Sequence, residues 1–279
     1  MASLNNFHIK ATPASVITGV VFFLFVPVLL VLIRRSRHKN KSSLLEKKQH
    51  VVITGGSSGI GLSIARECIG IKKNDGEPML SHITLIARDK LKLESAQKEL
   101  NSQIDTCYGK EKNKIRIQIV SADISKYEVI SKAIDSEVIP NSPPPTVLFN
   151  VAGTAIPCRF LDADPTVFPH LMSTNYLGSV YTTRALVPHM IQNGGGTVVL
   201  TSSAAGQAGI YGYSAYAPTK FALRGLAEVL SMELAPYDIH VQLVFPPNTD
   251  TPGFELENKL KMEECKLMED AAGLYQPEE

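Results

Sequence analysis

The chain has 279 residues, 44% of them hydrophobic and 20% charged, and this composition excludes disordered, collagen-like and coiled-coil proteins. Its 28 Lys and Arg residues against 27 Asp and Glu give a formal net charge of +1, so no basic field indicates nucleic acid as a partner. The 4 cysteines are widely scattered, and we therefore expect neither a disulfide scaffold nor a metal site.

A long apolar stretch lies near the N-terminus. Residues 11–33 contain no charged side chain, and residues 16–33 would extend about 27 Å as a helix, close to the ~30 Å of a bilayer's hydrocarbon layer. A cleaved signal peptide would have a shorter apolar stretch, preceded by its positive charges. Here Lys10 alone precedes the stretch, and seven basic residues follow it: Arg34, Arg35, Arg37, Lys39, Lys41, Lys47 and Lys48. We predict a transmembrane anchor at 11–33, with residues 1–10 in the lumen and the basic linker 34–48 in the cytosol.

Between residues 49 and 254, runs typical of buried strands alternate with segments typical of helices. We predict strands at 50–54, 82–87, 114–121, 146–150, 197–202 and 240–245. We predict helices at 60–69, 89–104, 125–139, within 165–192 and at 215–235, and a surface insertion at 72–78. Continuously apolar strands joined by helices indicate one doubly wound parallel sheet, a Rossmann-type α/β fold with helices on both faces.

The first strand leads into the glycine-rich turn TGGSSGIG at 54–61. Glycines here allow a tight turn and a close approach of the backbone to a pyrophosphate, which then lies at the positive end of the following helix. A glycine-rich turn between a strand and a helix therefore predicts a dinucleotide site. Its predicted contacts are Gly55, Ser57, Ser58, Gly59, Ile60 and Gly61.

The ends of the next strands extend this site. The second strand ends at Arg88, where an NAD site would present an acidic residue to the ribose hydroxyls, and Lys92 follows one helical turn later. A guanidinium suits the 2′-phosphate of NADP, with Ser57 nearby, so we predict NADPH or NADP⁺ as the cofactor. Further predicted contacts at the ends of the third and fourth strands are Asp123, Ile124, Asn150, Ala152 and Gly153.

A constellation of polar residues predicts proton transfer at a carbonyl oxygen. Tyr216 and Lys220 are four residues apart at the start of a predicted helix and share one face. A nearby ammonium favours phenolate and lowers a tyrosine pKa from ~10, so Tyr216 could donate or accept a proton. Ser203 ends the fifth strand and would bind the same oxygen, with Ser202 as the weaker alternative. Asn175 could hold a water behind Lys220.

These motifs, in this order, resemble the short-chain dehydrogenase/reductase family over residues 49–254. The resemblance implies a catalytic tetrad of Asn175, Ser203, Tyr216 and Lys220. It also implies that the cofactor contacts Tyr216, Lys220, Pro246 and Thr249.

Four longer strings are similar to a subfamily that reduces long-chain sphingoid-base ketones: MSTNYLGSVY at 172–181, AGQAGIYGYSAY at 205–216, FALRGLAE at 221–228 and PPNTDTPGF at 246–254. That similarity implies NADPH-dependent reduction of 3-oxosphinganine to sphinganine on the cytosolic face of the endoplasmic reticulum membrane. Residues 206–213 and those from Phe254 onward are candidates for a lid over a lipid substrate.

The sequence alone leaves other functions possible. A different membrane-anchored reductase, acting on a steroid, a retinoid or a 3-oxoacyl-CoA, would share the tetrad and Arg88. The chain could also be an inactive binding subunit, and the sequence leaves its oligomeric state open, a homo-oligomer included. Residues 255–279 read as a truncated C-terminal substrate or lid segment, in which 276–279 resembles the start of a helix. The family's last helix and seventh strand have no counterpart here, so we expect the sixth strand to be an exposed edge.

Overall fold

The structure, a computed structural model, describes residues 49–109, 115–269 and 273–278. The predicted anchor at 11–33 and the basic linker at 34–48 lie outside the described residues. Within the described part, no helix combines the length and the apolar character that a membrane span requires.

Six parallel strands form one sheet in the order β3-β2-β1-β4-β5-β6. The strands are β1 (Gln49–Thr54), β2 (Leu80–Ala87), β3 (Arg116–Ser121), β4 (Val147–Asn150), β5 (Gly196–Thr201) and β6 (Ile239–Val244). The chain order reverses between β1 and β4, so the crevice at the carboxyl ends of these two strands is where ligands bind in such folds. The predicted doubly wound parallel sheet is confirmed.

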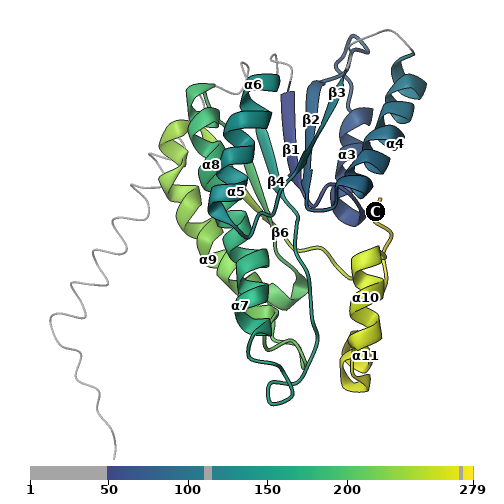
Figure 1. Ribbon diagram of the computed structural model, residues 1–279, viewed down its shortest axis with the longest axis vertical. Helices are drawn as coiled ribbons and strands as arrows, with labels where there is room; N and C mark the ends of the chain where they lie inside the picture. The colour runs from purple at the N-terminus through teal and green to yellow at the C-terminus, as the bar shows by residue number, and fades with distance from the viewer. Residues whose placement is uncertain (1–48, 110–114, 270–272, 279) are drawn as a thin grey trace, which may run out of the picture. The chain divides into compact units, whose positions relative to one another are not determined.

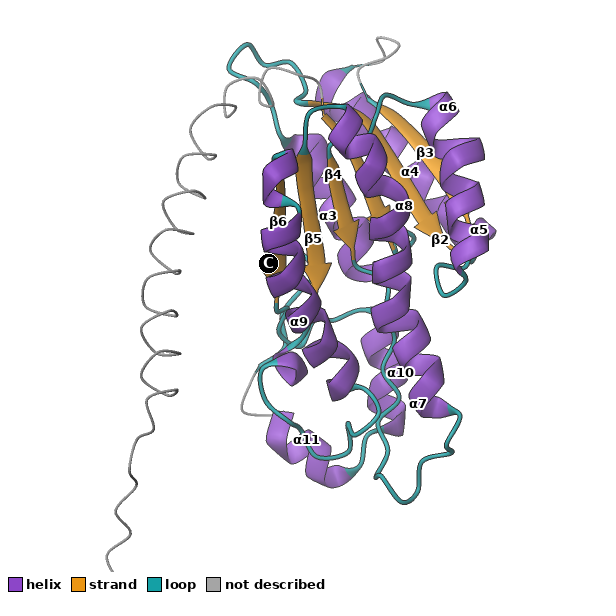
Figure 2. Ribbon diagram, turned by 90° about the vertical axis from the view of Figure 1, so that its left-hand side faces the viewer, coloured by secondary structure: helices purple, strands orange, loops and turns teal. Residues whose placement is uncertain are grey.

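Helices cover both faces of the sheet (Figures 1 and 2). On one face lie α3 (Gly59–Gly70) and α4 (Lys90–Tyr108), and on the other lie α5 (Tyr127–Ala133), α8 (Gly178–Gln192) and α9 (Ala217–Glu233). Side chains alternate along each strand, so neighbouring residues serve two separate cores. On β1, for example, Val52 packs with the α5, α8 and α9 side, whereas Val51 and Ile53 pack with α3 and α4.

Two of the predicted helices are continuous but irregular. The segment predicted at 125–139 consists of α5, a π-helical stretch Ile134–Val138 and the short α6 (Ile139–Asn141). The long helix predicted within 165–192 consists of α7 (Val167–Leu171), a second π-helical stretch Met172–Leu177, and α8. π-Helical turns are rare and often occur at functional sites. Asn175 lies in the second one.

The C-terminal segment lies at the carboxyl ends of the strands, next to the loop after β6. After β6 the chain forms α10 (Pro252–Leu260) and α11 (Glu263–Glu269). Tyr275 then pairs with the loop after β6, since its N–H donates to Asn248 O and its carbonyl accepts from Asp250 N. Residues 277 and 278 form a turn, and the helix start expected at 276–279 stays a prediction because residue 279 lies outside the described residues. There Glu278 accepts a hydrogen bond from Arg66.

Strand β6 lies at one edge of the described sheet, as predicted. Val241, Leu243 and Phe245 are only partly buried, while Val244 on the other face is 38% exposed. Val241 and Leu243 nevertheless pack against the core shared with α9. The apolar row on this strand is therefore half covered rather than bare.

Candidate active site

The turn between β1 and α3 takes a conformation that requires glycine. Gly55 and Gly59 have positive φ angles of 71° and 51°. A Cβ on Gly61 would lie 2.4 Å from Gly55 O, which no side chain could tolerate. Helix α3 starts directly after this turn; no side chain caps it at Ser58 and no acidic residue lies in its first turn. Its free N–H groups and positive helix end therefore suit an anionic phosphate.

A cavity of about 360 Å³ opens over this turn and across the ends of β1, β2 and β4. Twelve of the residues predicted to contact the cofactor line it: Gly55, Ser57, Ser58, Gly59, Ile60, Gly61, Arg88, Lys92, Asp123, Ile124, Ala152 and Gly153. The glycine turn, the helix end and the cations thus meet in one cleft that fits a dinucleotide.

Asn150 is not among the residues that line this cleft, and its predicted contact with the cofactor stays a prediction. The residue is 2% exposed, and its amide donates to Thr183 Oγ1 on α8 at 3.0 Å. Asn150 ends β4, and its side chain lies on the α8 face of the sheet. Its role in the structure is to join β4 to α8.

Arg88 and Lys92 give the cleft its positive charge. Arg88 is exposed, lines the cavity and has no ion pair within the described residues. Across the cleft, burial raises the pKa of Asp123, but hydrogen bonds from Ser125 and the charge of Arg88 outweigh it and lower the pKa overall. Oδ1 of Asp123 accepts from both the N–H and the hydroxyl of Ser125, so this carboxylate shapes the loop after β3.

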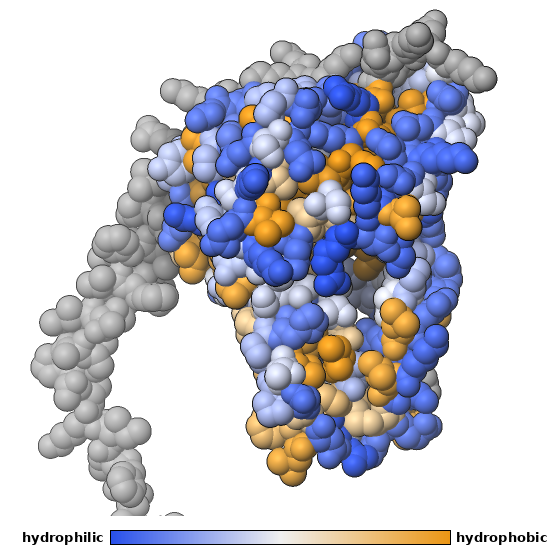
Figure 3. Space-filling model, in the orientation of Figure 1, coloured by the Kyte–Doolittle hydropathy of each residue, from blue (hydrophilic) through white to orange (hydrophobic). Residues whose placement is uncertain are grey.

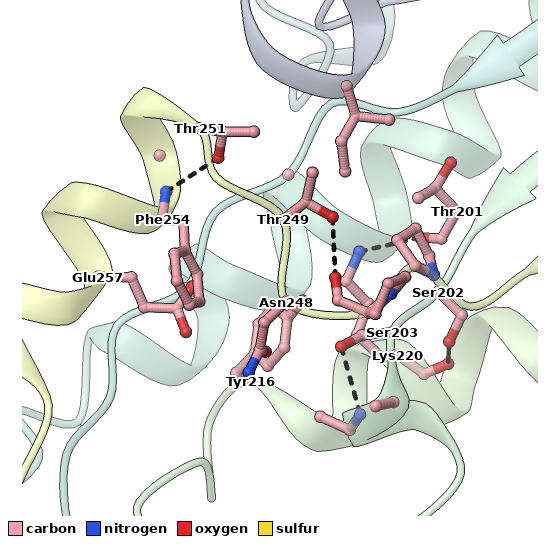
Figure 4. A pocket seen from close by; sticks show the side chains of 18 of the residues that line it. Thr201, Ser202, Ser203, Tyr216, Lys220, Asn248, Thr249, Thr251, Phe254 and Glu257 are labelled. Atoms are coloured by element: carbon pink, nitrogen blue, oxygen red, sulfur yellow. Dashed lines mark hydrogen bonds between the residues drawn. The ribbon is translucent and has the colours of Figure 1, made fainter. Parts of the chain in front are cut away.

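A second cavity, of about 210 Å³, adjoins the first and contains the predicted catalytic side chains (Figure 4). Ser203 follows β5, and Tyr216 and Lys220 come from the start of α9; all three line the cavity, as do Pro246 and Thr249. The two cavities share six lining residues: Ile60, Val151, Gly153, Thr154, Thr251 and Gly253. A dinucleotide in the first cavity would therefore reach the side chains of the second.

The two neighbouring serines have different surroundings. Ser202 is buried and its hydroxyl donates to Lys220 O at 3.0 Å, which ties β5 to α9. Ser203 is partly exposed and accepts from Ala205 N at 3.2 Å, which leaves its own hydroxyl proton free to be donated within the cavity. This geometry favours Ser203 over Ser202 as the group that binds a carbonyl oxygen.

Lys220 is a buried cation without an acidic partner in the described residues. Lys220 is 5% exposed and its Nζ donates to Thr201 O at 2.9 Å. The same Nζ lies 5.6 Å from the centroid of the Tyr216 ring. Burial lowers its pKa from 10.5 to about 8. The ammonium thus lies beside the phenol, as the spacing of the two residues predicted.

Asn175 holds the loop after β4 in place. Its Oδ1 accepts from Thr154 N at 2.8 Å, and its Nδ2 lies within 2.9 Å of Thr154 O and 3.1 Å of Thr219 Oγ1. The side chain thereby links the π-helical stretch to α9 next to Lys220. Its amide is engaged with protein atoms, and the water-holding role stays a prediction.

Several cavity residues were not predicted one by one. Thr251 and Gly253, at the start of α10, line both cavities, and Phe254 and Glu257 line the second. A signal for this helix is present in the sequence: Thr251 accepts from Phe254 N as an N-cap, and Pro252 follows at the first helical position. The three-residue spacing of Phe254 and Glu257 then places both on one face.

Comparison with known proteins identifies the family. The model of the short chain dehydrogenase family matches residues 49–261, three quarters of the chain. The chain belongs to the short chain dehydrogenase family. The resemblance predicted from the glycine turn and the Ser203, Tyr216 and Lys220 constellation is confirmed, and membership of this family supports a nicotinamide cofactor.

Relatives in this family carry more specific names. A zebrafish (Danio rerio) protein named 3-dehydrosphinganine reductase is 43% identical over 236 residues, which cover 82% of this chain and 65% of the relative. A Dictyostelium discoideum protein named 3-ketodihydrosphingosine reductase is 38% identical over 250 residues, covering 88% and 73%. The chain therefore spans about two thirds of the length of such relatives.

Solved structures agree on the fold. A 3-oxoacyl-[acyl-carrier protein] reductase from Brucella melitensis with bound NAD is 26% identical, with a TM-score of 0.66 over 85% of this chain and 82% of that one. L-sorbose reductase from Gluconobacter frateurii, solved with NADPH, is 24% identical with a TM-score of 0.67, covering 83% and 86%.

Proposed function

We propose that this protein reduces the ketone of a long-chain sphingoid base, 3-oxosphinganine, to the alcohol sphinganine with NADPH. The observation that carries this proposal is the convergence of Ser203, Tyr216 and Lys220 in a cavity that opens into the dinucleotide cleft. The names of the relatives supply the substrate class.

Each site residue has its own role in the proposed reaction. When bound, the cofactor supplies a hydride to the carbonyl carbon. Ser203 donates a hydrogen bond to the carbonyl oxygen and orients it, and Tyr216 protonates that oxygen as charge develops on it. The buried ammonium of Lys220 stabilises the phenolate that Tyr216 leaves behind.

The surface around the cavity suits a lipid. Large hydrophobic side chains are exposed on the loop between β4 and α7 and on α10 and α11: Phe160, Leu161, Leu256, Leu260, Leu267 and Met268. Figure 3 shows hydrophobic surface in the lower part of this face, in the region of α7, α10 and α11. A sphingoid base carries a long alkyl chain, which such a surface would shield from water on its way to Tyr216.

The test is NADPH oxidation by the purified full chain in detergent with 3-oxosphinganine, oestrone or retinal. We expect turnover with 3-oxosphinganine well above that with the other two ketones. A preference for oestrone or retinal would assign a different carbonyl reduction. Absence of turnover with all three, in a folded protein that binds NADPH, would mean a binding subunit.

The preference for NADPH rests on Arg88, and replacing it with aspartate should reverse that preference. An acidic side chain would repel the 2′-phosphate and accept hydrogen bonds from the ribose hydroxyls of NADH. We expect the ratio of kcat/KM for NADPH to that for NADH to fall by at least tenfold in Arg88→Asp. The measurement is steady-state kinetics with both cofactors.

A matched control makes the same charge change outside the cleft. Lys90, two residues further along and exposed, does not line the cavity. Lys90→Asp should leave the cofactor ratio unchanged. Equal ratios in wild type and Arg88→Asp would show that the phosphate is recognised elsewhere.

We further propose that residues 11–33 anchor the enzyme in the endoplasmic reticulum membrane with the catalytic domain in the cytosol. The support is the excess of basic residues after the stretch, seven against one. In intact microsomes, added protease should digest the domain after Arg34, while a tag on the N-terminus stays protected. A protected catalytic domain would reverse the topology.

A further inference from the structure

Glu257 brings a carboxylate into the cavity that holds Tyr216. It lies on α10, and Figure 4 shows it with Phe254 on the opposite side of the cavity from Ser203 and Lys220. Its side chain is 18% exposed. Among the residues described as lining this cavity, Glu257 is the one acidic side chain and Lys220 the one basic side chain.

One oxygen of this carboxylate is held by two neighbours. Tyr213 donates its phenolic proton to Oε1 at 2.5 Å, and Nζ of Lys261 lies 3.3 Å from the same oxygen. Lys261 is itself fixed, because its side chain is 1% exposed and its ammonium lies 4.0 Å from the centroid of the Phe254 ring. The orientation of Glu257 is therefore set before any substrate binds.

The second oxygen remains available. Within the described residues, Oε2 of Glu257 has no hydrogen-bond partner, although a carboxylate accepts up to about four hydrogen bonds. A substrate that fills the cavity removes water from this oxygen. Unless the substrate brings a donor, the carboxylate loses hydration without compensation, which disfavours binding.

Tyr213 contacts both the Glu257 carboxylate and the ring of the reacting residue, Tyr216. Tyr213, which holds Oε1, has its ring centroid 5.7 Å from that of Tyr216. A ketone bound at Tyr216 would occupy the cavity that Glu257 also lines, together with the substituents on its adjacent carbon. In a sphingoid-base ketone that carbon carries an amino group, a strong donor and a cation when protonated.

We propose that Glu257 determines substrate specificity by accepting a hydrogen bond from the amino group next to the ketone. This proposal rests on the proposed function and adds the group that distinguishes an amino ketone from other ketones. The same carboxylate disfavours anionic substrates such as acyl thioesters of coenzyme A, which bring negative charge to the site.

The test compares two ketones in wild type and Glu257→Gln: 3-oxosphinganine and 1-hydroxyoctadecan-3-one, which lacks the amine. Wild type should prefer the amino ketone. In Glu257→Gln we expect KM for the amino ketone to rise about ten- to one-hundredfold, the loss expected for a charge-assisted hydrogen bond, with kcat changed less. KM for the ketone without the amine should stay within about twofold, so the preference collapses.

Two controls separate recognition from a purely structural role. Glu255→Gln removes the same charge from an exposed position on α10 and should leave both KM values unchanged. Glu257→Gln also leaves the buried Lys261 without its carboxylate, so the double variant Glu257→Gln with Lys261→Met is measured as well. The double variant should regain thermal stability but not the preference for the amino ketone.

The outcomes that overturn the proposal are distinct. Equal losses with both ketones in Glu257→Gln, or a preference restored in the double variant, would show that Glu257 only neutralises Lys261. Wild type that reduces both ketones equally well would show that the amine is not recognised, while the proposed reduction stands. Wild type that reduces neither would overturn the proposed function, and this assignment with it.

Discussion

Replacing Tyr216 with phenylalanine is expected to lower kcat for ketone reduction by about 10²- to 10⁴-fold, the range typical of a lost general acid. The substitution removes only the phenolic hydroxyl. The ring that packs 5.7 Å from Tyr213 remains, so the cavity keeps its shape. Steady-state kinetics should therefore show the loss in kcat, while NADPH binding and the melting temperature stay close to those of wild type.

A control and a threshold make this prediction decisive. Tyr237 is 50% exposed and lies outside both cavities, so Tyr237→Phe should retain full activity. Activity of Tyr216→Phe within about tenfold of wild type, a barrier change of ~1.4 kcal/mol, would contradict the role of Tyr216 as proton donor.

The sheet could be predicted from the sequence because its strands are apolar on both faces. Val51, Val52 and Ile53 are all buried, which requires cover on each side and excludes an open, half-solvated sheet. The predicted strand limits agree with the observed ones to within two residues, because turns and charged residues flank each apolar segment. Parallel strands joined by helices leave few topologies with right-handed connections, and the observed order is one of them.

The site was predictable where it depends on local chain geometry. The glycine turn must adopt positive φ angles, and Tyr216 and Lys220 share a helix face, so both features follow from spacing alone. The π-helical stretch around Asn175 was not predictable, because it depends on contacts with Thr154 and Thr219, which are remote in sequence. Helix α10 was missed for another reason: the resemblance ended at Phe254, although Thr251 and Pro252 already signal a helix start.

Replacing Lys220 with methionine should also impair the reaction severely. Methionine has a similar length but no charge, so it removes the ammonium that lies 5.6 Å from the Tyr216 ring centroid. We expect kcat at neutral pH to fall about 10²- to 10³-fold, as for other preorganised electrostatic groups. Lys90→Met, on the exposed surface, controls for the loss of one positive charge and should have full activity.

The same variant tests the burial of this ammonium through the pH dependence of stability. Burial lowers the folded-state pKa of Lys220 to about 8, below the 10.5 of an ordinary lysine. Below pH 8 the folded and unfolded chains both carry this proton. Between about pH 8 and 10.5 the unfolded chain binds it and the folded chain does not, so Lys220 makes the free energy of unfolding rise with pH in this window. Above pH 10.5 neither state binds it, and its contribution is constant.

Lys220→Met lacks this contribution at every pH. The melting temperature of the variant, relative to wild type, should therefore be highest near pH 7 and decline steadily from about pH 8 to 10.5. Titrating groups that do not interact with Lys220 are common to both proteins and cancel in the difference. Thermal unfolding of both proteins without cofactor, from pH 7 to 10.5, measures this difference directly. A difference that does not vary with pH would mean that Lys220 keeps the pKa of an exposed lysine, and that the charge beside Tyr216 is hydrated rather than buried.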